Sequence, residues 1–362
     1  MKKSILFLIV ILTVIHFQTF AQGCVAIRST GGICTMSHVD GGDINSAPPK
    51  WVLNAASRYF RSYKHYSGKD EQKQRVEQGT EVINHSFVLD LSIVHNLNDR
   101  WSLYAGVPIL NNARSSLYEH GGKERKSTHS FGIGDARLAA YAWILDPKKA
   151  KKGNVQVGLG IKLPTGDYKY QDYFGPDSAK VLGPVDQSIQ LGDGGTGFTL
   201  EVNAFYNFAK RFGSYANFYY LMNPREQNGV STARGKAPTA AAIANTSDVM
   251  SVPDQFLIRG GASYAFNKLV ATAGVRMECV KVYDLIGGSN GFRRPGYVFS
   301  AEPGVTYALK RVNAFLSVPI ALIRNRTQSV PDKITSDMTG KYRIGDAAFA
   351  DYSVNVGISV KL

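Results

Sequence analysis

The side chains with catalytic potential in this chain are its seven histidines, three cysteines and many serines. A hydrolase of the serine or cysteine type needs a nucleophile beside a histidine that a third group orients. His85 and His95 share the parity of Phe87 and Leu91 in an alternating segment, so both should point outward near its two ends. No His-x-x-x-His spacing occurs, and the cysteines do not make a zinc set. The sequence therefore predicts no catalytic residues, no metal site and no cofactor.

A second group of polar residues consists of acidic and basic side chains within otherwise alternating apolar segments. A charged residue in mid-strand is costly unless it faces water or a partner, so these residues are expected to face the interior of a closed sheet. The interior candidates are Arg58, Asp90, Asp135, Arg137, Lys162, Glu201, Arg259, Arg276, Glu278 and Glu302. Two interpretations stay open: the charges pair and fill a polar core, or some of them line a solute path.

Four of these candidates should lie close together. Arg259 and Arg276 fall on neighbouring expected strands, and Glu278 lies one inward step beyond Arg276. Glu302 falls on the strand after that. Adjacent strands lie about 4.8 Å apart, so side chains of this length can meet across them. The sequence predicts a charge cluster inside the sheet.

The segments that must position these charges alternate with a period of two. The clearest, 154–163, places Val155, Val157 and Leu159 on one face and small or polar residues on the other. An apolar face of about 9 to 11 residues is the length that a tilted strand needs to cross the hydrocarbon layer of a membrane. A soluble antiparallel sheet also alternates, so repetition along the chain has to decide.

About twelve such segments recur from Trp51 to the C-terminus. Short connections such as 98–100 alternate with long ones such as 164–195, as expected for a transmembrane barrel and not for a soluble sandwich. The sequence predicts an all-β, transmembrane, antiparallel up-and-down β-barrel, closed by pairing of 51–61 with 350–362. An even strand count places both termini in the periplasm. The expected strands are 51–61, 82–97, 101–111, 131–145, 154–163, 197–209, 214–223, 255–266, 269–281, 296–309, 312–324 and 350–362.

The N-terminus predicts export. Two lysines precede an apolar run, and residues 19–21 provide a small-residue cleavage site, as in a secretory signal peptide. No other stretch offers 18 consecutive apolar residues, which argues against a helical inner-membrane protein. The expected organisation is a signal peptide at 1–21, an N-terminal periplasmic segment or plug at 22–50, and a Gram-negative outer-membrane barrel at 51–362.

Export to an oxidising compartment would allow the cysteines to form disulfides. Cys24 and Cys34 lie close together in an exported segment and are predicted to form a disulfide. Lipidation of Cys24 stays open as an alternative, although Ala21 stands where a lipoprotein signal prefers an aliphatic residue. Cys279 falls in an expected strand and is interpreted as a small apolar surface residue.

The chain has a formal net charge of +14, or +12 without Lys2 and Lys3. Nucleic acid is not an expected partner, because the chain is exported and has no compact Lys/Arg tract with interleaved aromatic residues. Contact with anionic lipid head groups, or an electropositive lumen, would use the excess.

Three short motifs carry a family resemblance. Gly132-Ile-Gly-Asp135, Lys162-Leu-Pro-Thr-Gly-Asp-Tyr168 and Gln190-Leu-Gly-Asp-Gly-Gly-Thr-Gly197 resemble the outer-membrane family named for the MetA pathway of phenol degradation, a transporter-like group. The resemblance covers roughly 80 to 360 and implies a barrel for the uptake of small, often aromatic or hydrophobic molecules. From the residues alone, the glycines allow a bend or a close backbone approach at a barrel rim. A phosphate-binding loop would need a helix after it, whereas a strand follows each motif.

Two functions stay open. The first is a channel or transporter for small, hydrophobic or aromatic solutes. The second is a structural or interaction barrel with a closed lumen, whose loops or N-terminal segment bind a periplasmic or outer-membrane protein. Outer-membrane lipid is an expected partner in both cases.

Overall fold

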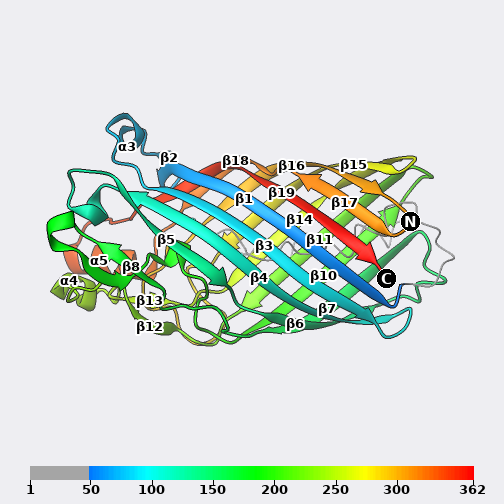
Figure 1. Cartoon of the computed structure of the whole chain (residues 1–362), viewed down its shortest axis with the longest axis horizontal. Coiled ribbons are helices and arrows are strands. Elements are labelled where there is room, and N and C mark those ends of the chain that lie inside the picture. The colour runs from blue at the N-terminus through cyan, green and yellow to red at the C-terminus, as the bar shows by residue number, and fades with distance from the viewer. Residues whose placement is uncertain (1–48) are drawn as a thin grey trace.

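The computed structural model describes residues 49–362, which form one closed antiparallel β-barrel (Figure 1). The predictions of a signal peptide and of a Cys24–Cys34 disulfide, and nearly all of the N-terminal segment, lie outside the described residues. The wall strands are β1 (Trp51–Ser67), β3 (Ile83–Asn96), β4 (Trp101–Ser116), β5 (Lys126–Ile133), β6 (Arg137–Trp143), β7 (Gly153–Lys162), β10 (Gly197–Asn207), β11 (Phe212–Met222), β14 (Gln255–Phe266), β15 (Leu269–Val280), β16 (Gly296–Ala308), β17 (Val312–Ser317), β18 (Ile320–Arg326) and β19 (Ala347–Lys361).

Two positions in the wall hold interrupted strands. β5 and β6 both pair with β4, on either side of residues 134–136. β17 and β18 both pair with β16 and with β19, on either side of Val318 and Pro319. When each pair is taken as one strand, the barrel has twelve, which confirms the predicted fold class.

The barrel closes between its first and last strands. Val52 lies opposite Lys361, and Tyr66 lies opposite Ala347. The predicted pairing of 51–61 with 350–362 is confirmed. A closed wall leaves no sheet edge, so the backbone hydrogen-bonding groups are satisfied within the protein, as a lipid environment requires. β1 continues six residues beyond its expected end at residue 61, because polar residues keep pairing past the apolar band.

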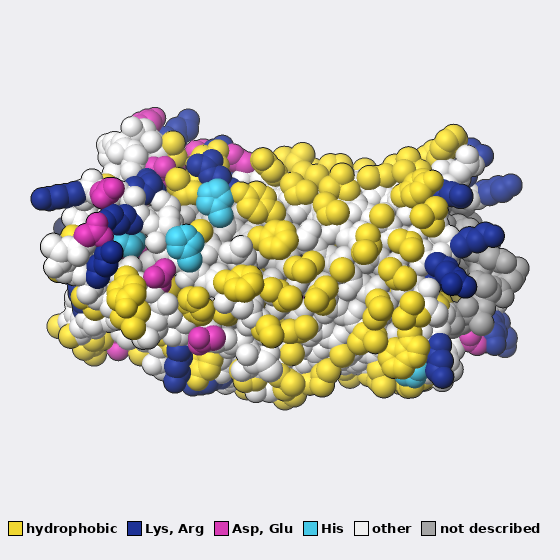
Figure 2. Space-filling model, in the orientation of Figure 1, with side chains coloured by type: hydrophobic (Ala, Val, Ile, Leu, Met, Phe, Trp, Pro, Cys, Tyr) yellow, Lys and Arg dark blue, Asp and Glu magenta, His cyan; other side chains and the backbone are white. Residues whose placement is uncertain are grey.

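Side chains alternate between the two faces of the wall. On β3, Phe87, Leu91 and Ile93 are 37 to 41% exposed, whereas Val88 and Val94 are 5% exposed. Figure 2 shows the result as a belt of hydrophobic side chains around the middle of the barrel, with charged side chains gathered at both ends. The described helices include none long and apolar enough to cross a membrane.

The two ends of the barrel differ in the length of their connections. At one end, called the turn end, the connections are 97–100, 144–152, 208–211, 267–268 and 309–311, and the C-terminus lies here (Figure 1). At the other end, called the loop end, six long loops hold all the remaining elements. These are β2 (Asp70–Glu71), α3 (Gln74–Glu77), η1 (Tyr118–His120), β8 (Gln171–Phe174), η2 (Asp177–Ala179), β9 (Val181–Pro184), η3 (Gln187–Ile189), β12 (Gln227–Ser231), α4 (Ala240–Ala244), β13 (Val249–Ser251) and α5 (Val330–Thr339).

The interpretation of Cys279 as a surface residue is wrong, since its side chain is only 1% exposed. Cys279 has outward parity, but it lies directly opposite Phe256 on β14, which in turn lies opposite Tyr220 on β11. The rings of Phe256 and Tyr220 stack. Parity alone therefore does not give the exposure of a small side chain between large neighbours.

The closing register can be tested by an introduced disulfide. Ser57 and Val356 lie directly opposite each other, so Ser57→Cys with Val356→Cys should cross-link in a background whose three native cysteines are serine. Leu53→Cys with Val356→Cys is the control, because four residues along a strand place that pair about 13 Å apart. A cross-link that joins 57 to 356 should speed the migration of the heated chain on a non-reducing gel. Cross-linking of the control pair alone would contradict this register.

Candidate functional site

One ion pair crosses the barrel interior. Arg58 on β1 donates two hydrogen bonds of 2.8 Å to the carboxylate of Glu278 on β15. β1 and β15 are not neighbours in the sheet, so these side chains meet through the interior and not along the wall. A bidentate pair of this kind fixes both side chains in one geometry.

The same carboxylate belongs to a larger charged network, defined as Arg58, Arg259, Arg276, Glu278 and Glu302. Arg276 lies 2.9 Å from Glu278 and 3.6 Å from Glu302, and Arg259 lies 3.2 Å from the second oxygen of Glu302. Arg276 and Glu302 are almost fully buried. The structure thus brings together the four residues of the predicted cluster and adds Arg58 from across the barrel.

The other interior candidates pair on the opposite part of the wall. Arg137 on β6 forms an ion pair with Glu201 on β10, across the intervening β7. Lys162 forms ion pairs with Asp135, at 3.6 Å, and with Asp193. Asp90 is half-buried on β3, opposite Pro108. The ten candidates are five basic and five acidic residues, so their formal charges cancel.

Aromatic side chains gather around Arg137 and form what we call the aromatic wall. Tyr104 and Tyr141 meet edge to face with centroids 6.2 Å apart, and Trp143 and Phe205 do the same at 5.9 Å. The Arg137 guanidinium carbon lies 4.3 Å from the centre of the Tyr104 ring and 5.8 Å from that of Tyr219. The members, all of inward parity, are Tyr104, Tyr141, Trp143, Phe205, Tyr215 and Tyr219.

Glycines let these rings lie against the barrel wall. A Cβ on Gly158 of β7 would overlap the ring of Tyr141, and a Cβ on Gly106 of β4 would overlap the ring of Tyr104. Gly158 faces Tyr141 directly across the β6–β7 pair. Without side chains at these positions, the rings present their flat faces and edges to the interior. The parity of the outward residues on β11 already implied inward Tyr215 and Tyr219, so the sequence held a signal for this wall.

The long loop after β7, residues 163–196, folds into the loop end of the barrel, and we call it the inserted loop. Leu191 packs against Val88 and Leu110, which both point inward. The backbone carbonyl of Ile189 accepts hydrogen bonds from the inward side chains of Asn112 and Ser130. This insertion could not be predicted from the sequence, because the polarity of a loop does not indicate which way the loop folds.

The three motifs that carry the family resemblance meet where β5 ends and β6 begins. The Asp135 carboxylate accepts a hydrogen bond of 3.0 Å from the Gly166 amide and one of 3.1 Å from the Asp193 amide. The Thr165 hydroxyl donates to the Gly134 carbonyl at 2.9 Å. These contacts, called the motif junction, fasten the inserted loop to the interrupted strand.

The position of Gly134 corrects one expectation. Gly134 lies within the wall at the break in the strand, not at the barrel rim. Its amide donates to the carbonyl of Pro108, and a Cβ would come within 2.9 Å of the Pro108 ring. The backbone of Gly134 thus approaches a neighbouring strand closely, as predicted. This approach occurs at the break in the strand, where the Gly134 carbonyl takes part in the motif junction.

Buried arginines hold the inserted loop from its other side. Asp186 accepts hydrogen bonds of 2.8 and 2.6 Å from Arg294, and Arg114 lies 3.5 Å away. Arg114 and Arg234 both also pair with Glu119. Burial opposes ionisation of Asp186, but Arg114, Arg294 and Arg234 outweigh it and hold its pKa well below the ordinary range. We call this cluster the clasp; it consists of Arg114, Glu119, Asp186, Arg234 and Arg294 and joins four of the six long loops.

Three of the described histidines, His65, His85 and His95, contact side chains or backbone of the barrel wall. His85 accepts or donates a 2.8 Å hydrogen bond with the Tyr59 hydroxyl, and His95 stacks on Trp51, both with outward parity as predicted. His65, expected in a loop, lies in the extension of β1. Its Nε2 accepts from the Val82 amide and its Nδ1 lies 3.0 Å from Asp346.

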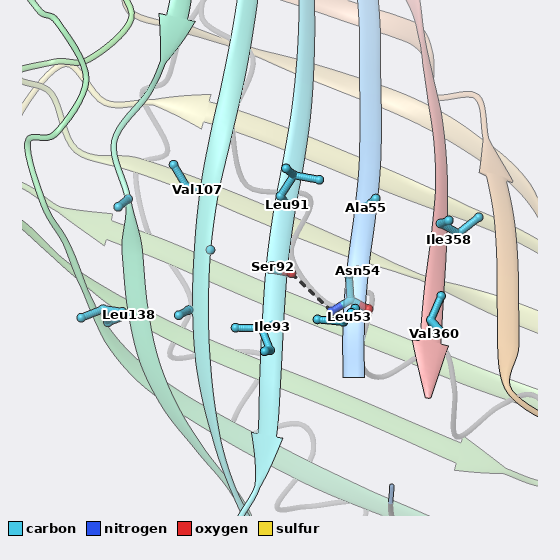
Figure 3. A pocket seen from close by; sticks show the side chains of 13 residues that line it. Leu53, Asn54, Ala55, Leu91, Ser92, Ile93, Val107, Leu138, Ile358 and Val360 are labelled. Carbon is cyan, nitrogen blue, oxygen red and sulfur yellow. Dashed lines mark hydrogen bonds between the residues drawn. The ribbon is translucent and has the colours of Figure 1, made fainter. Parts of the chain in front are cut away.

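A groove of about 600 Å³ lies on the outer face of the barrel (Figure 3). Leu53, Leu138 and Ile358 in its lining have outward parity and are 41 to 47% exposed. Figure 3 shows these side chains coming from strands at the β1–β19 closure and from β3 and β6. The groove is part of the hydrophobic belt and is separate from the polar interior.

The charged network should be sensitive to the loss of one member. Arg276→Ala would leave Glu278 and Glu302 short of a buried partner, which is expected to cost on the order of 3 to 5 kcal/mol of unfolding free energy. Urea unfolding of the reconstituted protein, followed by loss of heat-modifiable migration on gels, measures the change. Arg61→Ala removes an exposed cation and should change stability by less than about 0.5 kcal/mol. Equal effects of the two substitutions would contradict a buried network.

The clasp at Asp186 should persist in mild acid. A carboxyl whose folded pKa is depressed contributes stability above its unfolded pKa, about 3.9, and loses it only as the pH falls through the lower folded value. Limited proteolysis of the loops should therefore proceed at the same rate at pH 7 and pH 5. Asp186→Asn should accelerate cleavage several-fold, whereas Asp177→Asn, at an exposed site in the same loop, should not. Acceleration at pH 5 in the unsubstituted protein would oppose this account.

One solved structure shares this fold, and others are more distantly similar. The COG4313 outer membrane channel from Pseudomonas putida F1 superposes with a TM-score of 0.56 at 11% identity, over 89% of this chain and 98% of that chain. The P. putida toluene transporter TodX gives 0.42 at 10% identity, over 94% and 95%, and a P. aeruginosa FadL homologue gives 0.42 at 10%, over 86% and 90%. No family model and no curated protein matches, so membership of the phenol-degradation family stays a prediction. The chain has the fold of an outer-membrane channel barrel.

Proposed function

We propose that this protein is an outer-membrane channel for small solutes and that the solute path runs through the barrel interior. The observation that carries the proposal is that the interior holds an aromatic wall, which surrounds Arg137 and adjoins the charged network where the Arg259 guanidinium carbon lies 5.5 Å from the centre of the Tyr215 ring. The shared fold with the COG4313 outer membrane channel supports it.

The proposed solutes are small molecules with a flat apolar face and a polar edge. Aromatic rings favour stacked and edge-to-face contacts with other rings, and glycines hold the rings of Tyr104 and Tyr141 flat against the barrel wall. The charged network, which begins on the neighbouring strand β14, would orient the polar edge of the solute. The family resemblance to transporters of aromatic or hydrophobic molecules points the same way.

The proposed orientation places the turn end in the periplasm and the loop end outside the cell. Short periplasmic turns and long external loops are the rule for barrels of the outer membrane. The inserted loop would then stand at the external mouth, where the clasp and the motif junction hold it.

A second function is supported by the pair that crosses the interior. Arg58 and Glu278 join strands that are not neighbours, as expected if the interior is a sealed polar core. In that case the loops or the N-terminal segment would bind a protein partner, and the barrel would serve as an anchor.

Conductance separates these two functions. We expect the purified full-length protein to form channels in planar bilayers and to admit small aromatic solutes in liposome-swelling assays. Protein that is folded by its heat-modifiable migration, yet neither conducts nor admits solute, would favour the sealed barrel.

The charged network should set the ion preference of the channel. Arg259→Ala leaves Glu302 and Glu278 with one cation fewer in the network, so the reversal potential in a salt gradient should shift toward cation selectivity. Gly158→Leu should reduce aromatic flux at least several-fold, because its side chain would collide with Tyr141. Leu159→Ala, which changes the neighbouring outward residue, is the control and should leave both properties unchanged. A normal reversal potential and flux in the interior variants would remove the assigned path.

A further inference from the structure

The excess positive charge of the chain is concentrated at one end of the barrel. The turn end consists of the five turns together with Lys50, just before β1, and Lys361, the last residue of β19. It holds twelve Lys and Arg residues, and its acidic side chains are those of Asp99 and Asp146. This gives the turn end a formal charge of +10, compared with +14 for the whole chain. Figure 2 shows Lys and Arg side chains at both ends of the molecule, with fewer Asp and Glu side chains beside them at the turn end.

The rest of the described chain does not share this excess. The six long loops, residues 68–82, 117–125, 163–196, 223–254, 281–295 and 327–346, hold sixteen basic and eighteen acidic residues. The ten interior candidates sum to zero, and the remaining strand residues hold six basic residues against Asp351, so the described chain outside the turn end carries only +3. An electropositive lumen, one of the two uses considered for the excess charge, therefore does not account for it.

The turn cations are exposed and mostly unneutralised. Lys148 pairs with Asp99 at 2.6 Å and still has a side chain that is 74% exposed. Lys149, Lys210, Lys268 and Lys310 are exposed, and none of the four forms an ion pair with another residue in the range 49–362. Holding so many like charges together is unfavourable without a counter-charge, which indicates an anionic partner.

The position of these cations along the barrel axis indicates which anionic partner they contact. Large apolar side chains of outward parity stand just inside the turns and form an aromatic girdle at the edge of the hydrophobic belt. Girdles of this kind mark the boundary between the hydrocarbon and the head groups. Its members include Trp51, Trp101, Phe208, Phe212, Phe266 and Tyr307, which are 38 to 58% exposed. The turn cations lie immediately beyond it, at head-group depth.

The arrangement of the cations also favours a bilayer surface over a protein. Every turn of the turn end carries at least one Lys or Arg, so the cations surround the whole circumference. A protein partner would contact one side of the barrel, whereas a leaflet surrounds it. We propose that the turn end binds the anionic phospholipid head groups of the surrounding leaflet through this ring of cations.

The ring of cations should prefer anionic phospholipids, because each Lys or Arg near an anionic membrane surface is attracted to it electrostatically. Salt screens this attraction. Phosphatidylglycerol should therefore be preferred to phosphatidylcholine around the turn end. This preference does not depend on whether the barrel conducts.

Tryptophan quenching can measure the preference at this end. Trp51 and Trp101 point outward at the turn end, so quenching of their emission reports the lipid of that leaflet, whereas the inward Trp143 contributes emission that lipid does not quench. The full-length protein would be reconstituted with mixtures of brominated and ordinary phosphatidylglycerol and phosphatidylcholine. At low salt, we expect the quenching to show that phosphatidylglycerol binds at least about threefold more tightly than phosphatidylcholine. The preference should shrink in roughly 0.5 M salt, because the Debye length then falls to a few ångströms.

Two matched quadruple variants localise the effect. The turn variant lowers the formal charge of the turn end from +10 to +6 and should clearly reduce the preference, whereas the loop variant, which removes the same charge from the other end, should keep it. Heat-modifiable migration confirms that each variant is folded. The turn variant carries Lys149→Gln, Lys210→Gln, Lys268→Gln and Lys310→Gln, and the loop variant carries Lys69→Gln, Lys123→Gln, Lys236→Gln and Lys341→Gln.

Three results would overturn the proposal. Equal quenching by the two brominated lipids in the unsubstituted protein would exclude a head-group preference. A preference that the turn substitutions leave unchanged, or one that the loop substitutions lower to the same extent, would show that the turn cations do not produce it.

Discussion

The closing hydrogen-bonded register between β1 and β19 is the interaction on which the rest of the structure depends. Lipid offers no hydrogen bonds, so a strand edge in the hydrocarbon layer would leave a row of backbone donors and acceptors unsatisfied. Closure removes that edge and gives each strand one face toward lipid and one toward the interior. The alternation of apolar and polar residues follows directly from this geometry.

A closed wall also sets the conditions inside. The charged side chains of the inner face are mostly buried, and they become tolerable when they pair with one another. The charged network and the Arg137–Glu201 pair meet that condition, and the interior candidates are neutral as a set. Most of the net charge of the chain lies in the turns, where we propose that it faces the membrane surface.

The motif junction shows how one interruption of the wall organises a loop. The break between β5 and β6 frees the Asp135 carboxylate and the Gly134 carbonyl for contacts outside the ladder. The inserted loop supplies the groups that satisfy them, and the clasp around Asp186 holds its other side. Three short motifs far apart in the sequence therefore act as one structural unit, which gives a physical reason for their occurrence together in one chain.

The strand number, the closing pair, and the inward parity of residues such as Arg259 and Arg276 could be predicted from the sequence, because a period of two in side-chain polarity is a local property of each strand. Even the aromatic wall was implied by parity, through Tyr215 and Tyr219. The partners of those inward residues could not be predicted, because Arg58 meets Glu278 only once the wall has closed and brought distant strands face to face. The insertion of residues 163–196 was likewise decided by tertiary structure. The direction in which a polar loop folds depends on which side chains it can contact, and here these include Asp135 and Arg294.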